Sequence, residues 1–390
     1  MKVLRRPLFR ALPILVALLS LARLVGAEEL QLVYTSDAHF GITRPHFRGA
    51  DNVDALTVNK ALVERINGLS AAVLPADGGL GQGAAVGPVD CLIETGDIAN
   101  REEGAGDKAI QSATVSWRQF TETYIEGLQL KDRAGRKAEL LLVPGNHDVS
   151  NALGSYKVMT PPKDPAALLG IYNMMLKPAE PKTAATLNAA KDRVNYSRDI
   201  AGLHFIFVQM WPDLAGRAWI EADLAKVGKS TPVLLFTHAN PELESKYFTN
   251  PNGAHDMNSK DKFENVVDVI FKSGAKVDDP SVAEQRDLAA FLKRHPNVVA
   301  YFHGHVHLNQ FYTWIGPDKD LALPVVSVDS PMKGIISSAD EKKLSFQLIT
   351  IDTEAKLMTV REVLWNADPA NPAAPLAFGG SETISLLPRK

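Results

Sequence analysis

Cysteine is almost absent from this chain of 390 residues, which contains only one, Cys91. A single thiol excludes an internal disulfide, so the hydrophobic core must stabilise the fold. Cys91 lies within the apolar residues 89–93, and no base stands near it in the sequence. We therefore predict a buried small hydrophobe rather than a reactive thiol.

An excess of positive charge is also absent, because 42 Lys and Arg face 45 Asp and Glu, for a net charge of −3. The first 27 residues contain five basic residues and no acidic one, so removing these five charges takes the net charge from −3 to −8. This balance excludes a binder of nucleic-acid phosphates by net charge. An anionic substrate would need locally placed cations, such as metal ions.

No apolar run near the N-terminus is long enough to span a membrane. Residues 11–22 are apolar, but twelve residues are too few for a spanning helix. Lys2 and three arginines precede this run, and Val25-Gly26-Ala27 follow it. The pattern is typical of a secretory signal peptide cut after Ala27, so we expect a secreted or periplasmic protein without a membrane anchor. A short retained anchoring helix is the alternative.

Alternating strand and helix patterns predict an α/β fold of layered sheets and helices. The predicted strands up to residue 302 cover residues 30–36, 89–95, 138–143, 202–210, 232–237 and 297–302. The predicted helices cover residues 51–69, 110–128, 217–227 and 281–294. Residues 323–328, 344–351 and 356–363 alternate in hydropathy and predict neighbouring antiparallel strands.

The catalytic domain is expected to span residues 28–366. Insertions are predicted at about 40–88, 150–200 and 240–280, because these segments are rich in loop-forming residues. The tail at 367–390 is rich in Pro, Ala and Gly, and we expect it to be loosely held.

Five of the predicted strands end in polar residues that can bind metals. In chain order these are Asp37 and His39, then Asp97, then Asn146 with His147 and Asp148, then His238, and finally His305 with His307. In an open α/β sheet, ligands bind beyond the carboxyl ends of the strands. We therefore expect these side chains to meet at one edge of the fold.

The donors at these strand ends are oxygen and imidazole groups, with no thiolate. The candidate ligands are Asp37, His39, Asp97, Asn146, His238, His305 and His307. This mixture suits Mn, Fe or Zn rather than a soft-metal centre. Seven ligands exceed the needs of one tetrahedral site but suffice for two metal ions if one carboxylate bridges. Taken singly, a histidine at a strand end is more often structural, and only the joint pattern indicates a metal centre.

These motifs resemble those of the calcineurin-like metallophosphoesterase superfamily. The matching blocks are Asp37-Ala38-His39, Gly96-Asp97, Gly145-Asn146-His147-Asp148, Thr237-His238 and Gly304-His305-Val306-His307. All of them occur in the family's order, between residues 30 and 307. The resemblance implies a four-layer α/β/β/α sandwich, with long insertions capping the metal edge.

The resemblance also implies a role for each residue. Asp37, His39 and His307 would hold a first metal ion, Asp97 would bridge, and Asn146, His238 and His305 would complete the second site. A hydroxide between the metals would attack phosphorus in line. Asp97 and His147 would be catalytic, with His147 protonating the leaving oxygen or stabilising charge on the phosphoryl group. Arg101, Asn146 and His147 would bind substrate.

Two departures from family patterns concern His39 and Asn100. Purple acid phosphatases have Gly and Tyr at these places, so this chain does not resemble an enzyme with a tyrosinate-bound iron. Protein Ser/Thr phosphatases have Gly-Asp-x-x-Asp-Arg, whereas this chain reads Gly96-Asp97-Ile98-Ala99-Asn100-Arg101. An Asn therefore replaces the Asp that would orient the catalytic His, unless Asp148 or an insertion supplies the carboxylate.

The expected function is an exported two-metal hydrolase of phosphate esters. The insertions favour a small organic phosphate or a nucleotide as substrate, and the choice between monoester and diester stays open. One alternative is a non-catalytic binding or scaffold protein with this fold, although such proteins would be expected to have lost ligands. Another is a nuclease, which the acidic charge balance disfavours.

Overall fold

The computed structural model describes residues 29–100, 111–149, 164–188, 191–243 and 280–390. The proposed signal peptide, Arg101 and most of the 240–280 insertion therefore lie outside the described residues. Within the described part of the chain, no helix is long and apolar enough to cross a membrane.

The first of two large sheets has six strands in the order β14-β13-β12-β1-β4-β5. Their bounds are β1 Glu29–Thr35, β4 Cys91–Glu94, β5 Glu139–Leu142, β12 Ser345–Asp352, β13 Leu357–Leu364 and β14 Ala377–Ser385. β1, β4 and β5 are parallel, whereas β12, β13 and β14 are added as antiparallel neighbours. The carboxyl ends of β1, β4 and β5 therefore reach the same edge.

The second sheet also has six strands, in the order β10-β11-β9-β8-β7-β6. Their bounds are β6 Asn195–Ile200, β7 Leu203–Val208, β8 Val233–Phe236, β9 Val298–His303, β10 Gln310–Trp314 and β11 Leu323–Ser327. The four central strands are parallel, and β6 and β10 are the antiparallel edges. A separate hairpin joins β2 Thr43–Phe47 to β3 Ala50–Asp54.

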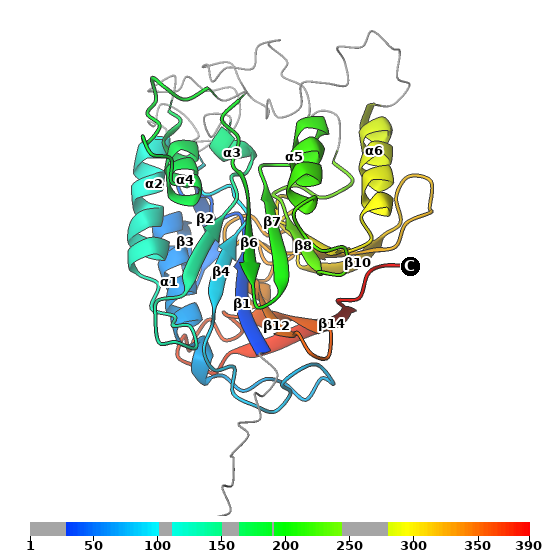
Figure 1. Cartoon of the computed structure of the whole chain (residues 1–390). Helices are drawn as coiled ribbons and strands as arrows, with labels where there is room; N and C mark the ends of the chain where they lie inside the picture. Colours follow the sequence, from blue (N-terminus) through cyan, green and yellow to red (C-terminus); the bar gives the residue numbers. More distant parts are fainter. Residues whose placement is uncertain (1–28, 101–110, 150–163, 189–190, 244–279) are drawn as a thin grey trace, which may run out of the picture.

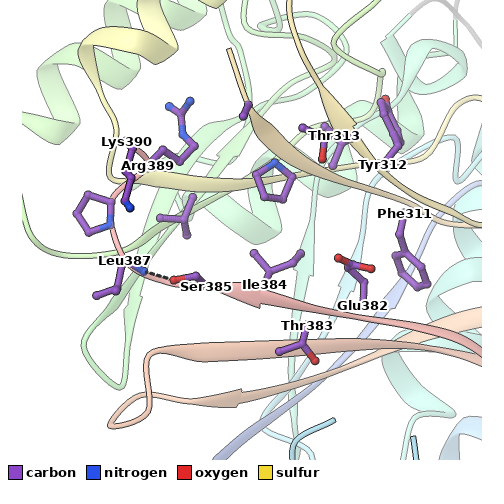
Figure 2. A pocket seen from close by; sticks show the side chains of 15 residues that line it. Phe311, Tyr312, Thr313, Glu382, Thr383, Ile384, Ser385, Leu387, Arg389 and Lys390 are labelled. Carbon is purple, nitrogen blue, oxygen red and sulfur yellow. Dashed lines mark hydrogen bonds between the residues drawn. The ribbon is translucent and has the colours of Figure 1, made fainter. Parts of the chain in front are cut away.

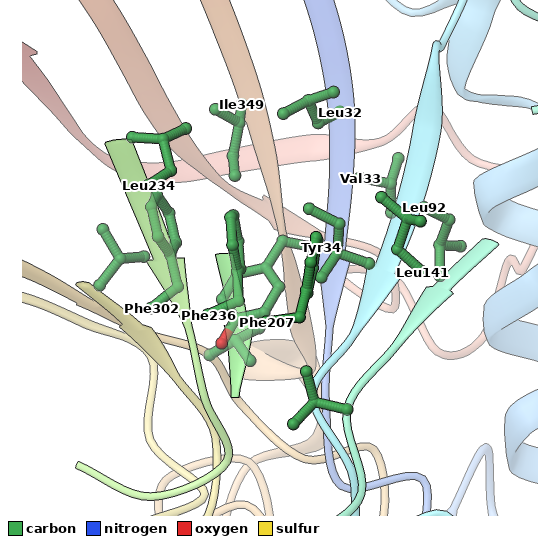
Figure 3. Close-up of a cluster of buried hydrophobic side chains, with 14 of the residues drawn as sticks. Leu32, Val33, Tyr34, Leu92, Leu141, Phe207, Leu234, Phe236, Phe302 and Ile349 are labelled. Carbon is green, nitrogen blue, oxygen red and sulfur yellow. The ribbon is translucent and has the colours of Figure 1, made fainter. Parts of the chain in front are cut away.

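The two sheets pack face to face through an aromatic core (Figure 3). Tyr34 of β1 meets Phe236 of β8 and Phe302 of β9 edge-on, with ring centroids 5.9 and 5.6 Å apart. All three side chains are fully buried. Because the central strands are buried on both faces, their sequences are continuous apolar runs rather than alternating ones. Cys91, at the start of β4, is buried as predicted.

Helices lie beside each sheet (Figure 1), which gives the α/β/β/α layering that the resemblance implied. The helices are α1 Ala55–Asn67, α2 Ala113–Phe120, α3 Asn146–Val149, α4 Ala166–Leu176, α5 Leu214–Leu224 and α6 Pro280–Arg294, and a π-helical turn, Thr121–Glu126, continues α2. α1 begins at Asp54, whose carboxylate accepts a hydrogen bond from the Thr57 backbone N–H. Val58, Leu62 and Ile66 form its buried face.

Several sequence predictions were wrong. The tail is not loosely held, because β14 pairs with β13 from Leu357 to Leu364. β11 does not join β12 and β13, because it pairs with β9 and β10 in the other sheet. The segments expected as insertions contain regular elements that were not predicted: β2 and β3 in the first, and α4 and β6 in the second. The helix predicted at 51–69 is confirmed as α1. Short apolar clusters in these segments complete the helical layer and a sheet edge.

Candidate metal centre

The candidate ligands follow five parallel strands whose carboxyl ends meet between the two sheets. Asp37 and His39 follow β1, Asp97 follows β4, and Asn146 follows β5 in the first sheet. His238 follows β8, while His305 and His307 follow β9 in the second sheet. The structure thus brings all seven predicted ligands together at one edge.

One group of ligand atoms consists of Asp37, His39, Asp97 and His307. The His307 Nε2 atom lies 3.1 Å from Asp37 Oδ1 and 3.1 Å from His39 Nε2. His39 Nε2 also lies 3.9 Å from Asp97 Oδ2. All four atoms lie within 4.8 Å of one another, which is the spacing of donors that surround a single ion.

A second group consists of Asp97, His238 and His305. The Asn146 amide oxygen completes it, at 2.9 Å from both His238 Nε2 and His305 Nδ1. His238 Nε2 lies 3.4 Å from Asp97 Oδ2. The two groups therefore share Asp97, in the arrangement that the resemblance implied for a bridging carboxylate.

The electrostatics of this buried cluster require positive charge. Asp37 and Asp97 are almost completely buried, and burial alone would raise their pKa values. Neighbouring imidazoles, His307 for Asp37 and His238 for Asp97, hold the pKa of each carboxyl below its usual range. Burial opposes protonation of His238, but the Asp97 carboxylate raises its pKa to about 10. Two buried carboxylates need compensating positive charge, which protonated imidazoles or bound metal ions can supply.

Five of the seven candidate ligands have left-handed backbone conformations. Their φ values are 60° for Asp37, 45° for His39, 51° for Asp97, 64° for His305 and 53° for His307. Residues other than Gly rarely adopt positive φ, and such strained residues cluster at functional sites. The strained backbone positions therefore lie at the strand ends that form the candidate metal centre.

Two glycines permit the motif loops to approach closely. A Cβ on Gly145 would overlap Asp97 and come within 2.7 Å of the His238 ring, and one on Gly304 would overlap Ser36 and Asp37. Any side chain at either position would push apart loops that contain candidate ligands. This explains the Gly that precedes Asn146 and the Gly that precedes His305.

Hydrogen bonds to the Nδ1 atoms of His238 and His39 leave the Nε2 atom of each ring free for a metal. His238 Nδ1 lies 2.8 Å from the Thr95 carbonyl oxygen, so it donates there and directs the Nε2 lone pair into the centre. The Asn100 side chain lies 3.3 Å from His39 Nδ1, and its Oδ1 has no partner among the described residues. Exchanging the amide O and N by a flip lets Oδ1 accept from Nδ1–H, which frees His39 Nε2. The donor set therefore fits two metal ions.

His147 lies beside the centre without belonging to either group. Its Nε2 is 3.8 Å from Asp97 Oδ2, and its ring packs edge-on against His39. Its Nδ1 has no hydrogen-bond partner among the described residues. Burial lowers the pKa of His147 to about 3, although Asp97 opposes this shift. A neutral imidazole here can donate one hydrogen bond to a bound phosphoryl group.

Asp148 does not orient His147. Its carboxylate accepts hydrogen bonds from the backbone N–H groups of Ala99 at 3.0 Å, Gly145 at 2.9 Å and Ile98 at 3.3 Å. It thereby joins the loop after β4 to the loop after β5. Asn100 does not reach His147 either, because it contacts His39. Among the described residues, a His–carboxylate dyad of the protein-phosphatase type is therefore absent.

The solved structures that the chain matches include several phosphoesterases. One is a dimetal phosphatase from Danio rerio, with a TM-score of 0.47 and 10% identity, covering 92% of this chain and 99% of the other. A predicted phosphoesterase from Streptococcus pneumoniae has a TM-score of 0.31 and 10% identity, with the same coverage. The calcineurin-like phosphoesterase YfkN from Bacillus subtilis has a TM-score of 0.30 and 12% identity, covering 92% and 91%. No protein-family model matches the chain, and no curated protein matches it in sequence.

These structures resemble the chain at identities of 10–12% and TM-scores of 0.30–0.47. At these values the likeness says nothing of the site, whose chemistry follows from this chain's own residues. Arg101, the predicted phosphate ligand, lies outside the described residues. His303 belongs to neither ligand group, because its Nε2 lies 3.2 Å from the Tyr312 hydroxyl.

The candidate metal centre has a further neighbour that the sequence prediction missed. The residues after β11 approach it, and the Ser330 hydroxyl donates to the Asp37 carbonyl at 2.8 Å. β11 is parallel to β9, so its carboxyl end opens on the same edge as the ligands. The strand-end rule that identified the ligands would have identified this turn as well, had β11 been placed in the correct sheet.

A cavity of about 720 Å³ lies away from this centre, between β10, β11, β14 and the C-terminal residues (Figure 2). Phe311 and Tyr312 line it from one side, and Thr383 and Ile384 line it from β14. None of the candidate ligands lines it. The chemistry of the cluster described above therefore does not extend into this cavity.

Proposed function

We propose that this protein is a dinuclear-metal hydrolase of phosphate esters. The observation that supports this most directly is the position of Asp97, whose carboxylate is shared by two groups of buried ligand atoms. A shared carboxylate between two sites is the arrangement of a two-metal centre, which is a recognised device for displacement at phosphorus. The metals best suited to these oxygen and imidazole donors are Mn, Fe and Zn.

Two metal ions bound in these groups would activate water as the nucleophile and neutralise charge on the phosphoryl group. His39, His238, His305 and His307 would hold the centre, and the hydrogen bonds to the Nδ1 atoms of His39 and His238 would help to fix its geometry. His147 would donate a hydrogen bond to a phosphoryl oxygen or a proton to the leaving oxygen. Asn146, next to His147 on α3, would contact both the second ion and the substrate.

The substrate class proposed is a small organic phosphate or nucleotide, as a monoester or diester. Support comes from the net negative charge, which disfavours polyanionic nucleic acid. We also propose that the enzyme works outside the cytoplasm, because residues 1–27 have the composition of a cleavable signal peptide. Sequencing the N-terminus of the exported protein tests this, and a chain beginning at Glu28 is the expected result.

The function is tested by metal analysis combined with hydrolysis of a p-nitrophenyl monoester and the matching diester. We expect about two ions per chain, hydrolysis of at least one ester, and loss of both in Asp97→Ala. Asp318→Ala is the matched control, because Asp318 is an exposed partner of Arg286. It should retain metal and activity.

The same experiment can overturn the proposal. If reconstitution with Mn, Zn and Fe gives neither bound metal nor hydrolysis, the chain is a binding protein with this fold. If single- or double-stranded DNA is hydrolysed faster than either small ester, the enzyme is a nuclease.

A further inference from the structure

A turn formed by residues 330–337 lies directly against the candidate metal centre. The Ser330 hydroxyl donates to the Asp37 carbonyl at 2.8 Å, and the Ile335 backbone N–H donates to the His307 carbonyl at 2.8 Å. Two residues of the first ligand group are therefore bonded to this turn. We call it the 330–337 turn.

Hydrogen bonds from β2 hold the 330–337 turn in place. The buried guanidinium of Arg44, in β2, donates to the carbonyls of Pro331, at 3.0 Å, and of Ser337. A side chain at Gly334 would overlap Ser337 and Asp329, so the turn is also closely packed inside. Residues that the turn exposes are thus presented in a fixed place relative to Asp37 and His307.

The turn presents one cation next to the centre. Lys333 is partly buried, and its backbone N–H donates to the Ser330 hydroxyl at 3.0 Å. Among the described residues, no carboxylate or carbonyl pairs with its ammonium group. Burial lowers the pKa values of His39 and His147, and the charge of Lys333 acts in the same direction on both rings. The turn that contains Lys333 is bonded to Asp37 and His307, two residues of the first ligand group.

Beside Lys333 the turn exposes two large apolar side chains. Ile335 is 63% exposed and Ile336 is 53% exposed, and they are the only adjacent pair among the exposed large hydrophobic residues of the described chain. A packed turn that leaves two isoleucines in solvent gains nothing from them in stability. Their exposure in a turn bonded to the candidate metal centre leaves them available to a ligand.

We propose that the 330–337 turn is the substrate-recognition element of this enzyme, in which Lys333 binds the phosphate and Ile335 and Ile336 contact an apolar alcohol group. The favoured substrates are then phosphate esters of apolar or aromatic alcohols. This inference rests on the proposed function and narrows its substrate class. Lys333 would supply a positive charge for the phosphate in a chain whose net charge is negative.

The test is competitive inhibition by methylphosphonate and phenylphosphonate against the nitrophenyl ester that the protein hydrolyses. The two inhibitors share the anionic group and differ only in the apolar one. We expect Lys333→Gln to raise both inhibition constants about tenfold, because a charge-assisted hydrogen bond is lost. Lys333→Arg should restore much of the binding.

The double variant Ile335→Ser with Ile336→Ser should instead reduce the preference for phenylphosphonate by about tenfold and leave methylphosphonate unchanged. Lys319→Gln and Ile315→Ser are matched controls, as Lys319 and Ile315 are exposed on the β10–β11 hairpin. Metal content should equal that of the native protein in every variant.

Two results separate this inference from the proposed function. If the native protein binds metal and hydrolyses the ester, but Lys333→Gln leaves both inhibition constants unchanged or the isoleucine variant keeps the phenyl preference, the recognition role of the turn is wrong. If the native protein shows neither metal nor hydrolysis, the proposed function fails, and this inference fails with it.

Discussion

The carboxylate of Asp148 accepts a hydrogen bond of 3.0 Å from the backbone N–H of Ala99. With the bonds from Gly145 and Ile98, this one buried side chain fixes the loop that contains Asp97 relative to the loop that contains Asn146. The precision of the second ligand group therefore depends on a residue that contacts no substrate.

Asp148→Asn should weaken both the fold and the second ligand group. An amide keeps one oxygen but turns its NH₂ toward a backbone N–H, leaving a buried donor unsatisfied at a cost of about 1–3 kcal/mol. Urea denaturation and metal titration measure the two effects. The control is Asp368→Asn, because Asp368 accepts a similar bond from Asn371 in solvent. Equal stabilities for both variants would contradict this role.

Single-ligand variants should separate the two halves of the centre. His39 belongs only to the first group, His238 only to the second, and Asp97 to both. We expect His39→Ala and His238→Ala each to retain about one ion, and Asp97→Ala to retain none. Metal analysis after gel filtration gives the stoichiometry.

The control for these variants is His303→Gln, because His303 lies on β9 but in neither ligand group. It should retain two ions per chain. If His39→Ala and His238→Ala both lost all their metal, the two groups would act as one site.

The candidate ligands could be predicted from the sequence because each of them follows one of five apolar strands within a few residues. Strand, tight turn and polar residue form a local pattern, and parallel strands bring such ends together whatever lies between them. The order of Asp37, Asp97, Asn146, His238 and His305 along the chain therefore contained most of the information about the site.

The residues that the sequence prediction missed depend on contacts between distant segments. Alternating hydropathy identified residues 323–328 as a strand but did not specify the sheet, so the 330–337 turn was not placed at the centre. The Pro and Gly content of the tail predicts a loosely held segment, but the tail contains β14, which is held by pairing with β13. The contact of Asn100 with His39 likewise depends on how two loops pack.

His147→Gln should slow hydrolysis without removing metal. His147 lies in neither ligand group, although its Nε2 is 3.8 Å from the shared carboxylate. Loss of a positioned proton donor lowers kcat by about 10²–10⁴. An alkyl ester should lose more than a nitrophenyl ester, because its leaving alkoxide needs a proton more strongly.

Comparing kcat for the two esters, with metal content measured in parallel, checks this role of His147. His295→Gln is the control, because His295 pairs with Glu221 and precedes the amino end of β9, whereas the ligands follow its carboxyl end. An equal loss on both esters would assign His147 to binding the phosphoryl group rather than to protonating the leaving oxygen.

The stability of the protein should fall with rising pH through Asp329, which packs against Gly334 of the 330–337 turn. Burial raises the pKa of Asp329 from 3.8 to about 7. Below pH 4 the carboxyl is protonated in both the folded and the unfolded chain. Between pH 4 and 7 only the unfolded chain ionises, so the free energy of unfolding decreases as pH rises. Above pH 7 both states are ionised and the loss is complete.

Asp329→Asn should remove this dependence, because an amide does not titrate and keeps a similar shape. The free energy of unfolding of the native protein, minus that of the variant, should decrease by up to about 4 kcal/mol between pH 4 and pH 8. Urea denaturation at several pH values gives this difference, and effects of bound metal common to both proteins cancel in it. A difference that stays flat across this range would show that Asp329 ionises as easily in the folded chain as in the unfolded one. The packing around Gly334 would then have to accommodate a charge, and the 330–337 turn would be less dry and less rigid than its contacts with Arg44 indicate.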